Sequence, residues 1–472
     1  MVVVEGLGTG LVGAYGSSTA VTPALDRFAA QGVLLDQCFV DSQSLSEQLR
    51  SLWTAQHALY RAPGNRHGGG SLLAEGKAAG DQSWSLWREC QRRSTVADWQ
   101  ARLLTDCPRV AEVADALGCH NITLVEPHIA SGAAVDSAQC TAMELFATAA
   151  ELLKDSPPGL VWIHSRGLRH PWDAPIALRQ QFVDPDDPDP PQDVVPPALD
   201  VSSATDPDLV VGWGQVAAAQ AAVIDEALSA LRDTVAQRAD ANTWHWLFSS
   251  LAGVPLGEHG RLGWGRPQLF GTELQTATMI VPALQSPGEH FPISTAESRA
   301  TVVPALQSHV QHCPIGQRRP ELFQLPDIAA TLAAMLQFTL PAAAWGRNVL
   351  ELGAAQSPAR WPKEFQLAML STARQQWIRS PAWSALLMGE LGGRDGDEDG
   401  DSVGHLIGGA INDTDWLFVK PEDRWEVSQI ADRRRNIVTL HRHLAPLFEA
   451  AVLTENRAAL PELDDDLLNL LR

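Results

Sequence analysis

The sequence predicts an α/β protein, because short apolar segments typical of buried strands alternate with longer helical segments. Val2–Glu5, Leu160–His164 and Trp244–Phe248 are apolar runs of strand length. Ala142–Lys154 has the spacing of an amphipathic helix, and Val216–Val235 is a long alanine-rich helix. At 472 residues the chain exceeds one ordinary core, so one large domain and a smaller one are expected.

The composition is that of a globular protein, with 45% hydrophobic and 19% charged residues. A net charge of −21 disfavours nucleic acid and anionic membranes as partners. No apolar run reaches the length of a membrane span, and Val2–Val4 is too short for the apolar region of a signal peptide. We therefore expect a soluble, cytoplasmic protein. Its six cysteines lie far apart without a C-x-x-C pair, which predicts buried thiols rather than a metal cluster.

The segment Phe248–Gly260, F-S-S-L-A-G-V-P-L-G-E-H-G, follows the third apolar run and carries several glycines, as a tightly turned loop does. In open α/β sheets such a strand end is where ligands bind. The segment resembles F-T-S-D-H-G-x-x-L-G-E-H-G of the sulfatase family, in which the Asp-His pair helps to hold the catalytic metal. Here Leu251 and Ala252 occupy those two positions. Aliphatic side chains have no lone pair for a cation, so these metal ligands are missing.

The N-terminal segment extends the resemblance. Thr22–Gly32, T-P-A-L-D-R-F-A-A-Q-G, is similar to the family's T-P-x-L-D-R-x-A-x-x-G, which follows an acidic strand end. Glu5 falls where the family places a metal-binding Asp, and Val4 where many members carry a second. A glutamate is a competent oxygen ligand but is one methylene longer. Glu5 is therefore the surviving metal-ligand candidate, and a hydrogen-bonded polar group is its structural alternative.

The segment Asp41–Ala55, D-S-Q-S-L-S-E-Q-L-R-S-L-W-T-A, aligns with the family's C/S-x-P-S-R, whose Cys or Ser is oxidised to the formylglycine nucleophile. Ser46 and Arg50 keep the Ser-to-Arg spacing and are catalytic candidates by this resemblance. Alignment from Thr54 instead places Leu45 at the nucleophile position, and Ser44 is an alternative candidate to Ser46. The structural alternative is that Ser46 caps a helix or lies exposed on it.

The remaining candidates are basic. G-L-R-H-P-W-D-A-P resembles the family's D-P-H-x-P-Y-D-P-P, and the proline register puts Arg169 at the place of the catalytic histidine. An arginine can bind an oxyanion but cannot donate a proton near neutral pH. His259 keeps its place in L-G-E-H-G, and Arg266 keeps the positive charge of the family's W-G-K region.

The resemblance extends to about residue 440 and implies the fold. We expect an alkaline-phosphatase-like and sulfatase-like α/β sandwich with a mainly parallel central sheet in residues 1–355. A smaller C-terminal α/β subdomain with a helical tail is expected in residues 356–472. Residues 60–110 read as irregular and Asp184–Pro197 as a solvated loop. Asp395–Asp401 matches only the first half of a calcium loop, since Leu406 stands at the twelfth position, and an acidic hairpin tip is predicted.

Two functional hypotheses remain. The family hydrolyses sulfate esters with a calcium ion and formylglycine. Replacement of these parts favours an inactive pseudo-sulfatase that binds no calcium and has a binding or scaffold role. The alternative is an active atypical sulfatase or phosphoesterase with relocated metal ligands. Arg50, Arg169 and Arg266 are expected to converge near the vacated metal position and to bind a small anion such as sulfate or phosphate, unless each pairs with a local carboxylate.

Overall fold

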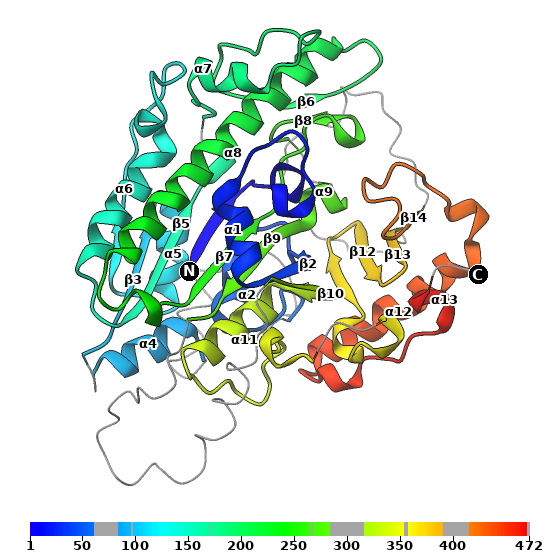
Figure 1. Ribbon diagram of the computed structural model, residues 1–472. Coiled ribbons are helices and arrows are strands. Elements are labelled where there is room, and N and C mark those ends of the chain that lie inside the picture. The colour runs from blue at the N-terminus through cyan, green and yellow to red at the C-terminus, as the bar shows by residue number, and fades with distance from the viewer. Residues whose placement is uncertain are drawn as a thin grey trace, which may run out of the picture.

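An eight-stranded sheet lies at the centre of the protein with helices on both faces (Figure 1). The computed structural model describes residues 1–60, 84–95, 98–169, 171–265, 268–283, 316–353, 357–389 and 415–469. The strand order is β10-β2-β9-β7-β1-β5-β3-β4. In chain order these strands are β1 (Val2–Glu5), β2 (Val33–Phe39), β3 (Gln100–Thr105), β4 (Ile122–Leu124), β5 (Gly159–Ser165), β7 (Trp246–Leu251), β9 (Gln275–Val281) and β10 (Gln317–Gln324).

The sheet is mainly parallel, as predicted. β9 runs antiparallel to β2 and β7, and the other pairings of the sheet are parallel. Successive side chains of β1 enter opposite layers, with Val3 in one hydrophobic core and Val2 and Val4 in the other. Burial on both faces explains why this strand is an uninterrupted apolar run.

The helices divide between the two cores. α1 (Pro23–Gln31), α6 (Thr141–Lys154) and α8 (Pro207–Ala236) pack on one face of the sheet. The other face is covered by α2 (Leu45–Thr54), α4 (Leu86–Ser94), α5 (Pro108–Ala116) and α11 (Leu325–Met335). None of the described helices is long and apolar enough to cross a membrane.

α8 begins at Pro207, nine residues before the predicted start at Val216. The Asp206 side chain accepts from the backbone N of Asp208, and Pro207 occupies the first helical position. An acidic N-cap followed by proline favours a helix start, because the cap accepts a free N–H and proline lacks one. The expectation of an irregular chain at 60–110 is wrong where the structure describes it, since α4 and β3 lie there. β3 was not predicted as a strand because its first half is largely polar and partly exposed, so it lacks a continuous apolar run.

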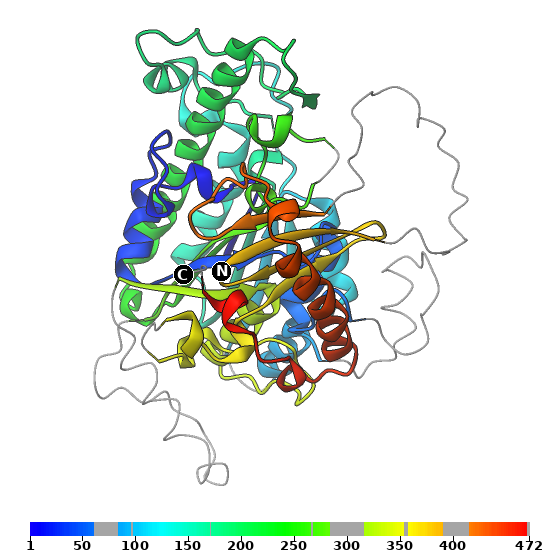
Figure 2. The same cartoon turned by 90° about the vertical axis from the view of Figure 1, so that its right-hand side faces the viewer.

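The C-terminal part forms the predicted smaller subdomain (Figure 2). Its four-stranded antiparallel sheet has its own hydrophobic core with α12 (Arg435–Leu453) and α13 (Asp465–Leu468). The strands are β11 (Ala368–Ser371), β12 (Gln375–Ser380), β13 (Trp383–Met388) and β14 (Trp416–Val419). The acidic segment Asp395–Asp401 lies outside the described residues. A domain boundary near residue 355 stays a prediction.

Two further sequence predictions concern loops and thiols. Asp184–Pro197 contains neither helix nor strand, as expected. The cysteines within the described ranges are buried free thiols: Cys38, Cys90, Cys107, Cys119 and Cys140. Cys313 lies outside those ranges.

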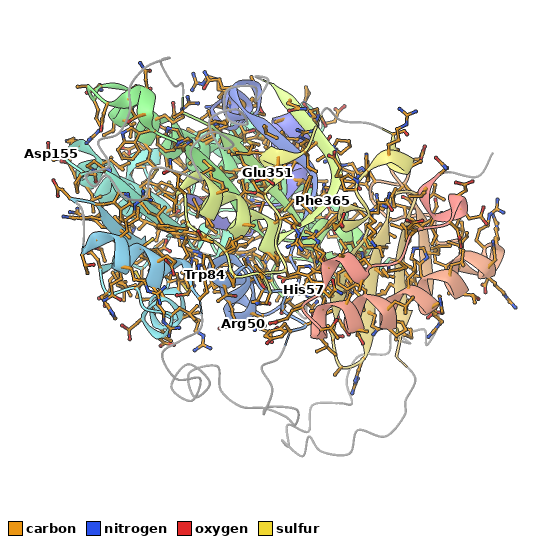
Figure 3. The ribbon with its side chains drawn as sticks, turned by 90° about the horizontal axis from the view of Figure 1, so that it is seen from below. Arg50, His57, Trp84, Asp155, Glu351 and Phe365 are labelled. Atoms are coloured by element: carbon orange, nitrogen blue, oxygen red, sulfur yellow. The ribbon has the colours of Figure 1, made fainter. Side chains whose placement is uncertain are left out.

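His57 is buried where the large domain meets α12 (Figure 3). Its Nδ1 accepts from the backbone N of Leu59 at 3.1 Å, so Nε2 carries the proton and donates to Oε1 of Gln324 at 3.2 Å. The ring also contacts Trp345 and Phe448, at centroid distances of 5.9 and 5.5 Å. Burial lowers the pKa of His57 to about 3, which keeps the ring neutral.

We expect the wild type to lose about 2 kcal/mol of stability relative to His57→Gln between pH 7 and pH 5. The pKa of His57 is lower in the folded than in the unfolded state, so the unfolded chain takes up this proton first. Stability is therefore lost as pH falls below about 6.5. Urea unfolding at each pH measures the difference. His120→Gln, at an exposed histidine, serves as the control, and parallel pH profiles for wild type and His57→Gln would contradict the prediction.

Candidate functional site

The candidate site lies where the carboxyl ends of β1, β5 and β7 meet. Glu5 is the last residue of β1 and pairs in register with Leu251 of β7. On the other side of β1, Val4 pairs with Ser165 of β5. Glu5 is only 2% exposed, so its carboxylate needs partners within the protein.

Both carboxylate oxygens of Glu5 have a nitrogen partner from the same chain. Nε2 of His164 lies 3.1 Å from Oε1, and Nε of Arg169 lies 3.0 Å from Oε2. The His164 side chain is fully buried, whereas that of Arg169 is 42% exposed. Charge-assisted contacts of this kind are stronger than neutral hydrogen bonds. The negative charge of Glu5 is therefore compensated by a guanidinium group of the chain.

Two glycines let the chain approach Glu5 closely enough for this pairing. Gly167 has φ 49°, and a Cβ there would lie 2.4 Å from the backbone oxygen of Glu5. Gly6 has φ 81°, and a Cβ there would lie 2.6 Å from the ring of Trp264. Any other residue would be strained and would clash at these positions. The 3₁₀ turn Gly167–Arg169 can therefore lie directly against the end of β1.

Trp264 also contacts the guanidinium. Cζ of Arg169 lies 3.9 Å from the Trp264 ring centroid, within the range of a cation–π contact. The indole Nε1 donates to the backbone oxygen of Leu168 at 2.8 Å, which fixes the ring against the same turn. Arg169 is thus held by both a carboxylate and an aromatic face.

The donor set at this edge does not fit a calcium ion. Calcium takes six to eight oxygen ligands, and the oxygens of Glu5 already accept from His164 and Arg169. Leu251 is 1% exposed and belongs to the hydrophobic core, and Ala252 follows it with φ 58°. Within the described ranges, no group of three or more His, Cys, Asp or Glu side chains is arranged to hold a metal.

Ser46 lies in the first turn of α2 and is buried. Nε of Arg109 donates to its Oγ at 2.7 Å, and the same guanidinium pairs with Glu112 at 3.0 Å. Ser44, not Ser46, is the N-cap residue, so the alternative of a capping or exposed Ser46 is wrong. A guanidinium beside a hydroxyl can hold an anion but cannot take up the proton of a nucleophile.

Arg50 binds the loop that follows α2 (Figure 3). Its terminal nitrogens donate to the backbone oxygens of Ala58 and Tyr60 at 3.1 Å. None of its contacts with described residues involves Glu5 or Arg169. Arg50 and Arg169 have separate partners, since Arg50 binds carbonyl groups and Arg169 pairs with Glu5. Arg266 lies outside the described residues, so the convergence of the three arginines stays a prediction.

His259 belongs to the junction with the C-terminal sheet. Its ring stacks flat on Phe270, with centroids 3.6 Å apart and planes 4° apart. Phe270 in turn contacts Trp416 of β14 at 5.5 Å. Burial lowers the pKa of His259, so the ring is neutral near pH 7. Its Nε2 is buried without a partner among the described residues, so the alternative of a fully hydrogen-bonded group fits Glu5 but not His259.

Sequence reasoning missed His164, Trp264 and Arg109 as parts of this edge. His164 is near the carboxyl end of a predicted strand, and such a position was a usable signal. Trp264 lies in the recognised G-W-G-R segment, but nothing there indicates an arginine partner. Arg109 lies in a segment expected to be irregular and gave no signal.

This architecture is the alkaline-phosphatase-like α/β fold, which solved sulfatases and phosphonate monoester hydrolases also have. The phosphonate monoester hydrolase of Agrobacterium radiobacter is similar with a TM-score of 0.62 and 13% identity, covering 100% of this chain and 99% of that one. The phosphonate monoester hydrolase of Silicibacter pomeroyi is similar with a TM-score of 0.63 and 12% identity, covering 95% of this chain and 94% of that one. A 2-O GAG sulfatase is similar with a TM-score of 0.61 and 10% identity, covering 99% of this chain and 96% of that one. No family model matches the sequence, and no curated protein matches it significantly.

Proposed function

We propose that this chain is a sulfatase-like protein without hydrolytic activity, in which a guanidinium group stands where the family resemblance places the metal. The observation that supports the proposal is the Glu5 carboxylate, which contacts Arg169 at 3.0 Å and His164 at 3.1 Å. A metal ion would have to displace both partners from a buried carboxylate. We therefore propose that no calcium is bound and that the retained role is binding or scaffolding.

The other parts of the reaction are also replaced. Ester hydrolysis by the family needs a Lewis acid, an activated nucleophile and a proton donor for the leaving group. Ser46 contacts a guanidinium rather than a base. The residue at the place of the family's proton donor is an arginine, which is not a general acid. Arg109 and Arg169 each have a carboxylate partner, so sulfate or phosphate is proposed to bind only weakly at this edge.

Turnover of aryl sulfates and aryl phosphonate monoesters should stay at the uncatalysed rate, with or without added calcium. The melting temperature should shift by less than about 1 °C on addition of EDTA, because a protein without a bound ion gains no stability from ion linkage. Both measurements use the full chain. Ser46→Ala is compared with Ser94→Ala, at an exposed serine of α4. Calcium-dependent turnover that is lost only in Ser46→Ala would instead support an active atypical sulfatase or phosphoesterase.

A further inference from the structure

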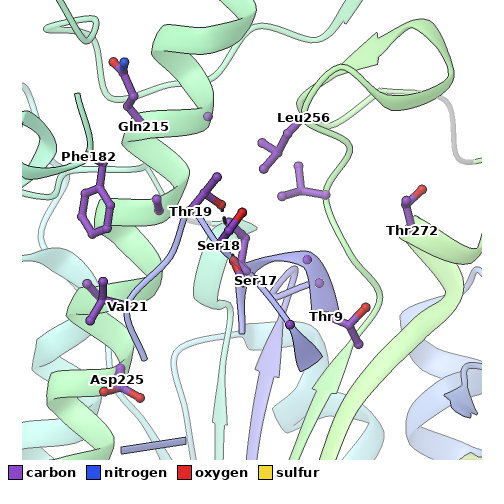
Figure 4. Close-up of a pocket in the computed structure, with 18 of the residues that line it drawn as sticks. Thr9, Ser17, Ser18, Thr19, Val21, Phe182, Gln215, Asp225, Leu256 and Thr272 are labelled. Carbon is purple, nitrogen blue, oxygen red and sulfur yellow. Dashed lines mark hydrogen bonds between the residues drawn. The ribbon is translucent and has the colours of Figure 1, made fainter. Parts of the chain in front are cut away.

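A large groove lies beside α8. Its volume is about 1020 Å³, and it is bounded by one face of α8, the segments 8–23 and 254–258, and the short helix α9 (Gly271–Leu274) with the start of β9 (Figure 4). Cavities of this size accept small-molecule ligands. Neither Glu5 nor Arg169 lines it, nor does Ser46 or His259. We call it the α8 groove.

The groove is long because one face of α8 carries small residues. Gly214, Ala218 and Ala222 line it at intervals of four residues, so they share one face of the helix. The lining residues of α8 extend from Val210 to Ser229. At 1.5 Å per residue this is about 28 Å. An extended ligand fits this shape better than a compact one.

The groove has an excess of negative charge. Its lining includes the cations Arg27 and Arg424 and a larger set of carboxylates: Asp184, Asp187, Asp225, Glu226 and Glu258. Asp225 accepts from the backbone N of Ala24 and of Leu25 at 2.8 Å and so holds the start of α1. The other four carboxylates form no ion pair with any described residue. Such a groove disfavours sulfate or phosphate groups and favours cations.

The four carboxylates without an ion pair are spread along the groove. Nε2 of Gln215 donates to Oδ2 of Asp187 at 3.1 Å, which places Asp187 beside the first half of α8. Glu226 lies eleven residues beyond Gln215 on the same helix, about 16 Å further along its axis. One compact ammonium ion therefore cannot reach both ends, whereas a ligand with several separated charges can.

Polar atoms of the lining also lack partners. Gln215 is 5% exposed, and its Oε1 has no hydrogen-bond partner in the described chain. Oγ1 of Thr272, on the opposite side of the groove, is likewise buried without a partner (Figure 4). Buried polar groups normally have partners, so these atoms point to an unfilled hydrogen-bonding position. An N–H donor from a ligand would satisfy the Gln215 oxygen.

The apolar part of the groove suits methylene groups and cations. Trp425 is 42% exposed, and Cζ of Arg424 lies 4.9 Å from its ring centroid. This ring already takes part in a cation–π contact, and such faces attract ammonium groups. Val21, which is 63% exposed, and Phe182 add apolar surface along the same groove.

We propose that the α8 groove binds an extended organic polycation of the polyamine class. Its ammonium groups would pair with Asp184 and Asp187 at one end and with Glu226 at the other, and its methylenes would lie against Phe182 and Val21. This ligand is opposite in charge to a sulfate ester. The proposal is independent of whether the strand-end site is active.

Spermine titrated into the full chain by calorimetry tests the proposal. We expect saturable one-to-one binding, weaker by about fivefold in Glu226→Gln and in Asp187→Asn, the effect of losing one partly exposed charge pair. Asp233→Asn, at an exposed carboxylate of α8 outside the groove, should bind like the wild type. Putrescine, a shorter diamine, should bind more weakly, and sulfate should not compete.

A second pair of variants tests the position of the site. Ala222→Phe fills the groove and should abolish spermine binding, whereas Ala230→Phe, at an exposed position of the same helix, should not. Circular dichroism establishes that each variant is folded. Equal weakening by Glu226→Gln and Asp233→Asn would show that spermine senses only the net charge of −21 and would overturn the proposal. So would the absence of binding, or unchanged binding in Ala222→Phe.

Discussion

Replacing Arg169 by leucine is expected to lower the free energy of unfolding by about 2–3 kcal/mol, less than for a fully buried pair because Arg169 is partly exposed. The substitution leaves the buried Glu5 carboxylate with His164 as its remaining partner at this position. Leucine keeps apolar contact with Trp264, so lost packing contributes little. Urea unfolding near pH 7 measures the effect.

The double variant Glu5→Gln/Arg169→Leu separates the charge from the packing. It should be more stable than Arg169→Leu alone by about 1–2 kcal/mol, because no unpaired charge is then buried. Lys154→Leu is the control, since it breaks the exposed pair with Glu151 and should change stability by less than about 0.5 kcal/mol. Simple additivity of the two single substitutions would contradict the proposed internal ion pair.

Replacing Arg457 by leucine should have the larger effect, a loss of about 3–5 kcal/mol. Arg457 is 3% exposed and forms an ion pair with Asp327, which is 1% exposed. The guanidinium also donates to the backbone oxygens of Glu364 and Trp345, both at 3.0 Å. Its removal leaves a buried carboxylate and buried carbonyl groups without this partner.

This ion pair joins the C-terminal segment to the large domain, because Asp327 lies in α11. Asp327 also completes the capping box of α11 with Gln324. Arg457→Leu should therefore also loosen the attachment of that segment, which limited proteolysis detects. Arg360→Leu, at an exposed arginine in a short 3₁₀ helix, is the control. Equal stability of the two variants would exclude a structural role for the pair.

The strands at the site were predictable because a strand that is buried on both faces is a nearly continuous apolar run in the sequence. Val2–Glu5 and Leu160–His164 are nearly continuous apolar runs, and both are strands of the central sheet. The resemblance also identified Arg169 as a replacement of the family's proton donor. The pairing of Arg169 with Glu5 was not predictable, since it depends on β5 lying beside β1 and on the close approach at Gly167.

The roles of the other arginines depended on features that a sequence pattern does not contain. Arg50 has the spacing of a catalytic residue, but the loop after α2 turns its carbonyl groups toward the guanidinium. Arg109 belongs to no recognisable sequence motif. It still contacts Ser46, because it lies in the first turn of α5, which begins just after the carboxyl end of β3. In both cases the backbone path decides which contact forms.

The guanidinium beside Glu5 differs from a metal ion in one further respect, because it is covalently attached. A tethered group has an effective concentration set by its linker, here the few residues between β5 and Arg169, and not by the surrounding solution. Every folded molecule therefore carries one cation at this position, whatever the calcium concentration around it. Dilution, chelators and competing ions cannot change that stoichiometry, so this part of the protein is complete as soon as the chain has folded.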